Sequence, residues 1–240
     1  MQTEPIILAI ETATSACSAA LLVGDSLYGR FEQTQRAHTQ LILPMIESLL
    51  HEAKVSRQAL QMIAVGRGPG SFTGVRIAVS CAQGLGFGLN LPIYPISTLE
   101  ALCFQLQQEI KEDNYVVVPA LDARMQEIYA SAFIVENQNI SSLHPEAIYA
   151  PHTLLNEMQL PKKNIKAIGS GWDTYFQEIV SLDLNQEVQL MGKRHPDARH
   201  IVQLAKMRWE KGEHGVLAQD LLPVYLRDNV AEKSSTRVFS

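Results

Sequence analysis

Short apolar runs and polar turns alternate along the first half of the chain. Residues 6–11 (IILAIE) form a run typical of a buried strand, and the run ends in an acid, Glu11. The polar stretch TATSA follows, and a second apolar run over 17–23 closes at Gly24-Asp25, which predicts a hairpin. Three further elements are predicted in this half: a strand over 27–33, a helix over Thr39–Ala53, and a strand over 62–66.

The second half repeats this order. An apolar run over 115–122 ends in Asp122, and a polar turn and a second run over 127–137 follow it. The series is completed by a strand over 146–150, a helix over 152–160, and a strand that begins at 165 and runs into a glycine turn. The segment MIAVGRGPG aligns with IKAIGSGWD when Glu11 is set over Asp122. The matched acid and glycine turn favour an internal duplication over chance, and so predict two similar α/β lobes with a ligand-sized cleft between them. The two acids would face each other across this cleft.

The remaining segments extend this plan. A helix is predicted from Pro95 that links the lobes, with Ser97 as its N-cap and Glu100 completing a capping box. Another helix is predicted near 195–215, with Asp197 near its start and Gly212 near its end. We therefore expect an N-terminal lobe over 1–108, a C-terminal lobe over 112–228 and a polar tail over 229–240.

Composition narrows the class of protein. The chain has 240 residues, a net charge of −5 and 46% hydrophobic residues, which suits a globular α/β protein. Charged or polar residues interrupt every apolar run before it could span a bilayer, and no signal peptide is evident, so a cytoplasmic location is expected. The three cysteines, Cys17, Cys81 and Cys103, form no C-x-x-C pair. The mild acidity argues against tight nucleic-acid binding by this chain alone.

The stretch GRGPGSFTGVR, from Gly66 to Arg76, raises the question of a phosphate site. A P-loop needs a lysine followed by Ser or Thr, and the stretch has no lysine. A dinucleotide fingerprint needs an acid about 20 residues further on, and none occurs before Glu100. Backbone amides at this turn remain able to bind an anion at the start of the predicted helix.

The helix that follows the turn is rich in small residues. Gly74, Ala78 and Ala82 recur every four residues, and Ser80, Gly84 and Gly88 mark a neighbouring face. Interior glycine lowers helix propensity, so several of them indicate close packing of another backbone. The two hypotheses are packing on the protein's own sheet and packing of one side against a partner subunit.

Other candidate chemistry is less specific. Glu11 and Asp122 could hold magnesium or act as acid and base, or could be structural acids, and Arg124 is placed to neutralise Asp122. The histidines form no H-E-x-x-H motif, and His38 at a helix start is expected to be exposed. Six basic residues gather on or near the helix after Asp197 and form either a solvated face or a minor RNA-facing patch: Lys193, Arg194, Arg199, Lys206, Arg208 and Lys211.

Several stretches together resemble the bacterial TsaB family, also called YeaZ. They are AIETATSACSAAL, RAHTQLILPMI, GRGPGSFTGVRIAVSCAQGLGF, PISTLEAL, LDARMQEIYAS and PVYLRDNVA, which cover nearly the whole chain. The resemblance implies two ribonuclease-H-like lobes of the actin, Hsp70 and sugar-kinase (ASKHA) type. It also implies a non-catalytic subunit that binds and activates TsaD. TsaD threonylcarbamoylates the adenosine next to the anticodon in tRNAs that read codons starting with A, and TsaE joins the larger complex.

The resemblance also assigns residues. Where the catalytic relative carries two metal-binding histidines this chain has Thr98 and Leu102, so no metal and no cofactor of its own are expected, apart from weak or shared ATP or ADP binding. Glu11, Thr12, Asp122 and Arg124 would line a vestigial cleft. Pairing with TsaD or with a second copy is expected through two N-lobe helices, with these residues: His38, Leu41, Ile42, Met45, Ser71, Phe72, Gly74, Val75, Ala78 and Ala82. The alternatives from the residues are a nucleotide-cleft ATPase or sugar kinase, and a metallopeptidase.

Overall fold

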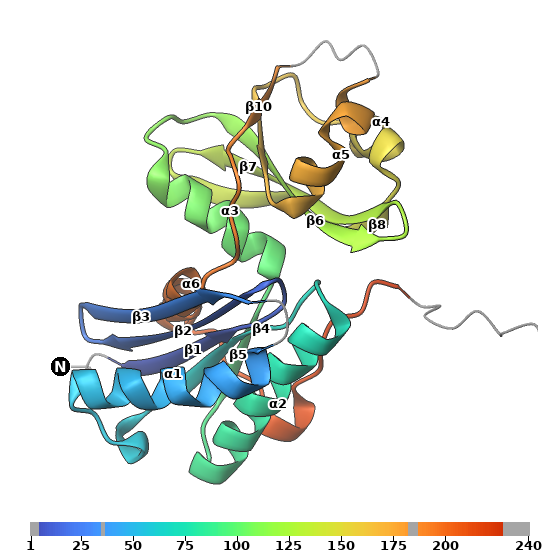
Figure 1. Ribbon diagram of the computed structural model, residues 1–240. Helices are drawn as coiled ribbons and strands as arrows, with labels where there is room; N and C mark the ends of the chain where they lie inside the picture. Colours follow the sequence, from blue (N-terminus) through green and yellow to red (C-terminus); the bar gives the residue numbers. More distant parts are fainter. Residues whose placement is uncertain (1–4, 35–36, 182–186, 228–240) are drawn as a thin grey trace, which may run out of the picture.

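The chain forms two lobes, each built on a five-stranded mixed sheet, as the computed structural model in Figure 1 shows. The structure describes residues 5–34, 37–181 and 187–227, so the predicted tail over 229–240 lies outside the described residues. The first sheet has the order β3-β2-β1-β4-β5 and contains β1 (Ile6–Glu11), β2 (Ala16–Val23), β3 (Ser26–Gln33), β4 (Met62–Gly66) and β5 (Ile93–Ile96).

The second sheet repeats the first. Its order is β10-β9-β6-β7-β8, and it contains β6 (Tyr115–Arg124), β7 (Glu127–Glu136), β8 (Asn139–Tyr149), β9 (Ile165–Ile168) and β10 (Val188–Leu190). In each sheet the first three strands are antiparallel neighbours, and the fourth strand pairs parallel with both the first and the fifth. Equivalent strands occupy equivalent places, which confirms the predicted duplication.

Helices cover both faces of each sheet. In the N-terminal lobe α1 (His38–Ala53) and α2 (Phe72–Leu89) cover the outer face and α6 (Ala198–Glu210) covers the other. In the C-terminal lobe α3 (Thr98–Glu109) packs on one face, and α4 (Leu154–Met158) and α5 (Ser170–Val180) pack on the other. Short 3-10 turns complete the chain: η1 (Arg57–Ala59), η2 (Pro151–Thr153) and η3 (Ala218–Asp220).

The two lobes exchange their last helices, which corrects the predicted boundaries. Leu99, Leu102 and Leu106 of α3 pack with Tyr115 and Val117 of the C-terminal sheet. In return, apolar residues of α6 pack on the N-terminal sheet: Ala198, Ile201, Val202 and Ala205. The lobes are therefore not the continuous segments 1–108 and 112–228, because each core needs a helix from the other half of the chain.

The start of α3 differs in detail from the prediction. Residues 93–96 form β5, and the helix begins at Thr98 rather than at Pro95. The Ser97 hydroxyl accepts hydrogen bonds from the backbone N–H groups of Leu99 and Glu100, both at 3.1 Å, as an N-cap does. The Glu100 carboxylate pairs instead with Arg208 of α6 at 2.5 Å, so this acid ties the two exchanged helices together.

A candidate protein interface on the N-terminal lobe

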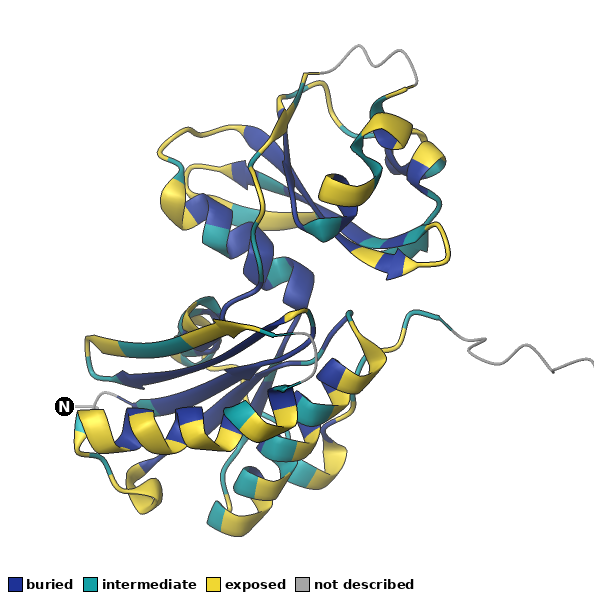
Figure 2. Ribbon diagram, viewed as in Figure 1, coloured by how far each residue is buried: buried dark blue, intermediate teal, exposed yellow. Residues whose placement is uncertain are grey.

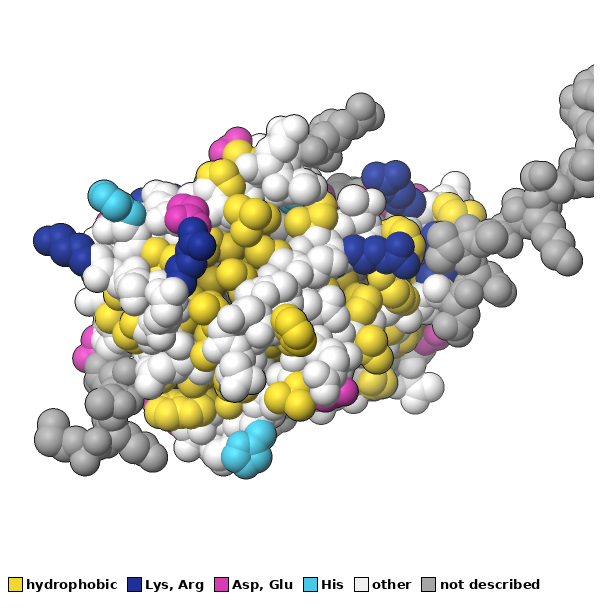
Figure 3. All heavy atoms as spheres, turned by 90° about the horizontal axis from the view of Figure 1, so that it is seen from below, with side chains coloured by type: hydrophobic (Ala, Val, Ile, Leu, Met, Phe, Trp, Pro, Cys, Tyr) yellow, Lys and Arg dark blue, Asp and Glu magenta, His cyan; other side chains and the backbone are white. Residues whose placement is uncertain are grey.

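An apolar groove runs between α1 and α2 on the outer face of the N-terminal lobe. It has a volume of about 670 Å³ and is lined by Thr39, Ile42, Leu43, Phe72, Thr73, Arg76, Ile77, Ser80, Cys81, Gly84 and Leu85. Leu43 is 53% exposed and Phe72 46% exposed. Figure 3 looks at the molecule from the side where these helices lie, and hydrophobic side chains gather on that surface. Exposed apolar surface of this kind is typical of a protein interaction site.

The inward face of α2 packs on the protein's own sheet. Gly74, Ala78 and Ala82 are buried, and Val75 and Val79 lie beside them in the same core. A Cβ on Gly74 would lie 2.1 Å from the Thr12 carbonyl oxygen, which shows how closely the helix approaches the first hairpin. The spacing of small residues thus serves this lobe's own packing.

The outward face of α2 carries the second set of small residues. Ser80, Gly84 and Gly88 are exposed, and a Cβ on either glycine would meet no atom within 4 Å. An exposed glycine in a helix interior lowers stability by about 1 kcal/mol relative to alanine. No packing among the described residues compensates for that loss of stability, so these glycines fit a role in keeping the surface open to the backbone of another chain.

Most of the predicted interface residues face inward, and this is a correction. Met45, Gly74, Val75, Ala78 and Ala82 belong to the core under the two helices, so a partner cannot reach them in the folded chain. His38 is also buried, with Nε2 donating to the Thr14 carbonyl oxygen at 2.9 Å, which overturns the expected exposure. The residues that remain at the surface of the predicted set are Leu41, Ser71 and Phe72, while the almost buried Ile42 forms part of the groove floor.

The residues missed by the sequence analysis follow from the same periodicity. Val75 and Val79 are the apolar side chains of α2 that are buried against the sheet together with Ala78 and Ala82, and they define the inward direction of the helix. The opposite stripe then contains Arg76, Ile77 and Ser80, and one turn further on Cys81, Gly84 and Leu85. The signal in the sequence is this stripe, and the spacing of small residues places two of its members, Ser80 and Gly84, on a face next to the buried one.

Glu11 is fully buried at the end of β1, under the start of α3. Its Oε1 accepts a hydrogen bond from the Ala13 N–H at 2.5 Å, and the Thr98 hydroxyl donates to its Oε2 at 3.4 Å. Burial raises the pKa of this carboxyl to about 7, although the hydrogen bonds from Ala13 and Thr98 lower it, and the nearby Asp197 raises it further. A Cβ on Gly66 would lie 1.8 Å from Oε2, so the carboxyl fills the space left by this glycine.

The cleft between the lobes holds only one of the two predicted acids. A cavity of about 560 Å³ is lined by both hairpin turns and includes Thr14, Asp122 and Arg124, but Glu11 and Thr12 do not line it. Thr12 is fully buried, and its hydroxyl donates to the Gly74 carbonyl oxygen at 2.6 Å. Exposed Asp122 accepts a hydrogen bond from the Arg124 backbone N–H at 2.8 Å, and this backbone contact stands in place of the expected ion pair. The two acids therefore do not face each other.

The basic residues near α6 are largely paired within the chain. Arg194 binds Glu109 at 2.6 Å, Arg199 binds Asp197 at 2.6 Å and Lys206 binds Glu210 at 3.4 Å. Arg208 binds Glu100, as described above. These pairs satisfy four of the six charges, which favours the solvated face over an RNA-facing patch.

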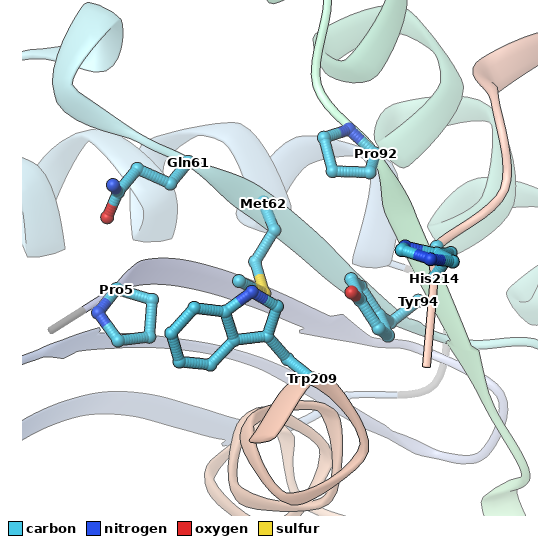
Figure 4. Close-up of a pocket in the computed structure, with 8 residues that line it drawn as sticks. Pro5, Gln61, Met62, Pro92, Tyr94, Trp209 and His214 are labelled. Atoms are coloured by element: carbon cyan, nitrogen blue, oxygen red, sulfur yellow. The ribbon is translucent and has the colours of Figure 1, made fainter. Parts of the chain in front are cut away.

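A smaller hollow of about 280 Å³ lies at the edge of the first sheet (Figure 4). Trp209 from α6 stands beside Met62, with Pro5, Tyr94 and His214 around it. The Tyr94 hydroxyl already donates to the Glu213 carbonyl oxygen at 2.9 Å. The hollow therefore offers an apolar wall rather than a set of converging polar groups.

Comparison with known proteins identifies the family. A family model described as TsaD: tRNA N6-adenosine threonylcarbamoyltransferase matches residues 32–235. A Haemophilus influenzae protein named tRNA threonylcarbamoyladenosine biosynthesis protein TsaB is 35% identical over 95% of each chain. The Escherichia coli protein of that name is 36% identical over 95% of this chain and 96% of its own. The chain belongs to the TsaB family.

The solved structures agree. YeaZ from Pseudomonas aeruginosa is 35% identical and superposes with a TM-score of 0.83, over 92% of this chain and all of that one. A second P. aeruginosa structure, described as an uncharacterized protein with similarity to peptidase YEAZ, has a TM-score of 0.81 at 34% identity, over 93% of this chain and all of that one. The two-lobed ASKHA fold expected from the resemblance to the TsaB family is thereby confirmed.

The positions expected to have lost metal ligands are filled by internal packing. Leu102 is fully buried in the core under the C-terminal sheet, and Thr98, also fully buried, holds the Glu11 carboxyl. Across residues 5–34, 37–181 and 187–227, no group of three or more His, Cys, Asp or Glu side chains is arranged to hold a metal ion. In the same residues no helix is long and apolar enough to cross a membrane.

Proposed function

We propose that this chain acts in the cytoplasm as a non-catalytic subunit of tRNA threonylcarbamoyladenosine biosynthesis that binds and activates TsaD. The names of its TsaB relatives support the pathway. The observation that carries the binding role is the groove between α1 and α2, where the exposed apolar side chains of Leu43 and Phe72 lie on the same surface as Gly84, a glycine whose Cβ position meets no atom of the described residues within 4 Å. A helix of TsaD fits such a groove, because small residues allow close approach of backbones and the flanking apolar residues supply buried area.

The binding role is tested by measuring affinity for the cognate TsaD by titration calorimetry. Leu43→Arg places a charge in the groove, and we expect it to weaken binding at least tenfold, because a desolvated charge without a partner is unfavourable. Leu190→Arg is the matched control, since Leu190 is a similarly exposed leucine on β10 of the other lobe. Equal affinities for the two variants and the wild type would reject the groove as the binding surface.

The activating role needs a separate measurement. In cells depleted of this chain, mass spectrometry of tRNA nucleosides should show loss of threonylcarbamoyladenosine, restored by the wild type and not by Leu43→Arg. TsaE is expected to join only after the pair has formed. Self-association through the same groove is expected when TsaD is absent, and Leu43→Arg should shift the chain toward monomer in sedimentation velocity.

A second candidate function is nucleotide binding in the interlobe cleft, alone or shared with the partners. The 560 Å³ cavity with Thr14, Asp122 and Ser170 on its walls favours it. ATP turnover by the isolated chain that is lost in Asp122→Ala would support the ATPase alternative over the scaffold. The metallopeptidase alternative predicts bound metal in the purified protein, which elemental analysis measures.

A further inference from the structure

Residues 221–227 cross from the N-terminal lobe to the C-terminal lobe. In Figure 1 this orange-red segment rises beside α2 toward the cleft. Hydrogen bonds fix it to the N-terminal lobe. The Gln83 side-chain amide donates to the Leu221 carbonyl oxygen at 3.0 Å, and the Val224 N–H donates to the Arg67 carbonyl oxygen at 2.8 Å. The segment therefore follows α2 along its length.

A stacked cluster joins the segment to the groove. Arg76 Nε donates to the Tyr225 hydroxyl at 2.6 Å, and the guanidinium carbon lies 3.6 Å from the Phe72 ring centroid and 5.4 Å from that of Tyr225. Phe72 and Arg76 line the groove, whereas Phe72 and Tyr225 line the interlobe cavity. The stack is thus a common wall between the candidate interface and the cleft.

The far end of the segment holds a strained turn of the C-terminal lobe. Arg227 pairs with Glu127 and donates to the carbonyl oxygens of Ala123 at 3.2 Å and Arg124 at 3.5 Å. Three successive residues of this turn, Arg124, Met125 and Gln126, have φ values of 61°, 54° and 57°. A tight hairpin turn needs this left-handed region, which residues other than glycine disfavour, so the contacts from Arg227 add to the stability of the turn.

We propose that residues 221–227 act as a strap that couples occupancy of the groove to closure of the interlobe cleft. The proposal rests on the proposed function, in which TsaD covers the groove. A partner seated there contacts the exposed side of Phe72 and fixes the stack, which holds Tyr225 and keeps Arg227 on the hairpin turn. Coupling between two sites is reciprocal, so a loosened strap also weakens TsaD binding.

Hydrogen exchange followed by mass spectrometry tests the strap on the full chain, with and without TsaD. In the free chain Arg227→Ala should exchange about tenfold faster over residues 120–130, with α2 unchanged. TsaD should slow exchange in both α2 and residues 120–130 of the wild type, but only in α2 of Arg227→Ala, whose TsaD affinity should fall about fivefold. Arg30→Ala is the control, because it breaks an exposed Arg–Glu pair within the N-terminal lobe.

The Tyr225→Ala variant distinguishes coupling along the strap from the direct contact of Arg227 with the hairpin turn. Tyr225 is part of the stack with Arg76, and none of its hydrogen bonds or ring contacts in the described residues reaches residues 120–130. The strap predicts several-fold faster exchange of 120–130 in this variant, and wild-type exchange there overturns the strap. If TsaD protects nothing in the wild type, the proposed function fails. The strap is then judged on the free chain, where unchanged exchange in Arg227→Ala and Tyr225→Ala overturns it.

Discussion

The stretch between the third and fourth strands of the N-terminal lobe contains the 16-residue helix α1 and the short turn η1. The same stretch of the C-terminal lobe contains η2 and the five-residue α4. The next helix is also longer in the N-terminal lobe: α2 has 18 residues, and α5 has 11 and a non-helical break at Tyr175. The outward side of α4 exposes Asn156 and Glu157, while that of α1 exposes Leu43 beside polar residues such as Glu47 and Ser48. Short helices suffice to cover a sheet, so the extra length of the N-terminal pair and the apolar groove between its helices indicate a second use. Figure 2 shows that both helices also have an exposed side.

The two hairpin acids also differ between the lobes, because one is buried and the other is exposed. Glu11 is buried beneath α3 with no basic side chain among its hydrogen-bond partners, whereas Asp122 is exposed at the cleft. In the N-terminal lobe the space for the acid is created by Gly66 and closed by a helix from the linker. The duplicated positions have therefore separated into one structural acid and one surface acid, and the lobes can be tested against each other.

The largest effect on stability is expected where α2 packs against the first hairpin of the N-terminal lobe. Gly74→Ala places a methyl group 2.1 Å from a backbone oxygen, and we expect a loss of about 4 kcal/mol in the free energy of unfolding, measured by urea titration. Gly171→Ala, in the first turn of α5, should lose less, since its nearest atoms lie at 3.1 Å. A Gly74→Ala protein as stable as Gly171→Ala would contradict the close approach of α2 to the first hairpin.

A second test compares the acids through pH. The folded state raises the pKa of Glu11 from 4.5 to about 7, so it binds this proton more tightly than the unfolded state. The stability contributed by the proton is fully present below pH 4.5 and is lost as pH rises to about 7, a change of about 3 kcal/mol. Glu11→Gln should abolish this loss and be more stable than the wild type at pH 8.

The matched variant is Asp122→Asn. Because Asp122 is exposed, this variant should keep the loss of stability between pH 4.5 and 7 seen in the wild type. Urea titrations at four pH values between 5 and 8 measure both variants. If Asp122→Asn, rather than Glu11→Gln, flattened the curve, the assignment of the buried acid would be wrong.

A smaller effect of opposite sign is expected on the outer face of α2. Gly84→Ala meets no atom and removes an exposed interior glycine, so the free chain should gain about 1 kcal/mol. The same methyl group narrows the groove and should weaken TsaD binding. Thermal unfolding and calorimetry measure the two effects. A variant that is stabilised without any loss of affinity would place the partner elsewhere.

The sequence predicted the strands and the order of elements well, because apolar runs bounded by turn residues specify strands locally. It missed three elements. For β5, Pro95 and the Ser97 cap suggest an earlier helix start; for α5, Ser170 and Gly171 suggest a turn; and the three-residue strand β10 is too short to give a pattern. The exchange of α3 and α6 was not predictable, since an apolar helix face does not specify which sheet it covers. Burial of Glu11 depends on Gly66 and Thr98, which are distant in sequence, so an acid at a hairpin turn gave no local sign of it.

The choice of face on α2 failed for a related reason. Glycine and alanine indicate close packing but do not indicate which surface they pack against. The inward side of α2 is identified by Val75 and Val79, which are buried against the sheet. Gly74 faces the backbone of the first hairpin, whereas no atom lies within 4 Å of a Cβ on Gly84. Only the three-dimensional structure therefore distinguishes the core glycine from the surface glycine. This is why most residues of the predicted interface lie on the buried side of the two helices.

The last prediction concerns the alkylation rate of the Cys81 thiol, which lines the groove. Cys81 lines the groove and is partly exposed, whereas Cys17 and Cys103 are fully buried. Burial raises the pKa of the Cys81 thiol from 9.0 to about 11, so at pH 8 its alkylation should be about a hundredfold slower than that of a free thiol and should quicken as pH rises. Mass spectrometry should find one modified cysteine in the native chain and none in Cys81→Ser. In the proposed complex TsaD covers the groove, so saturating TsaD should slow the reaction further. An unchanged rate in a proven complex would show that the partner leaves this part of α2 open.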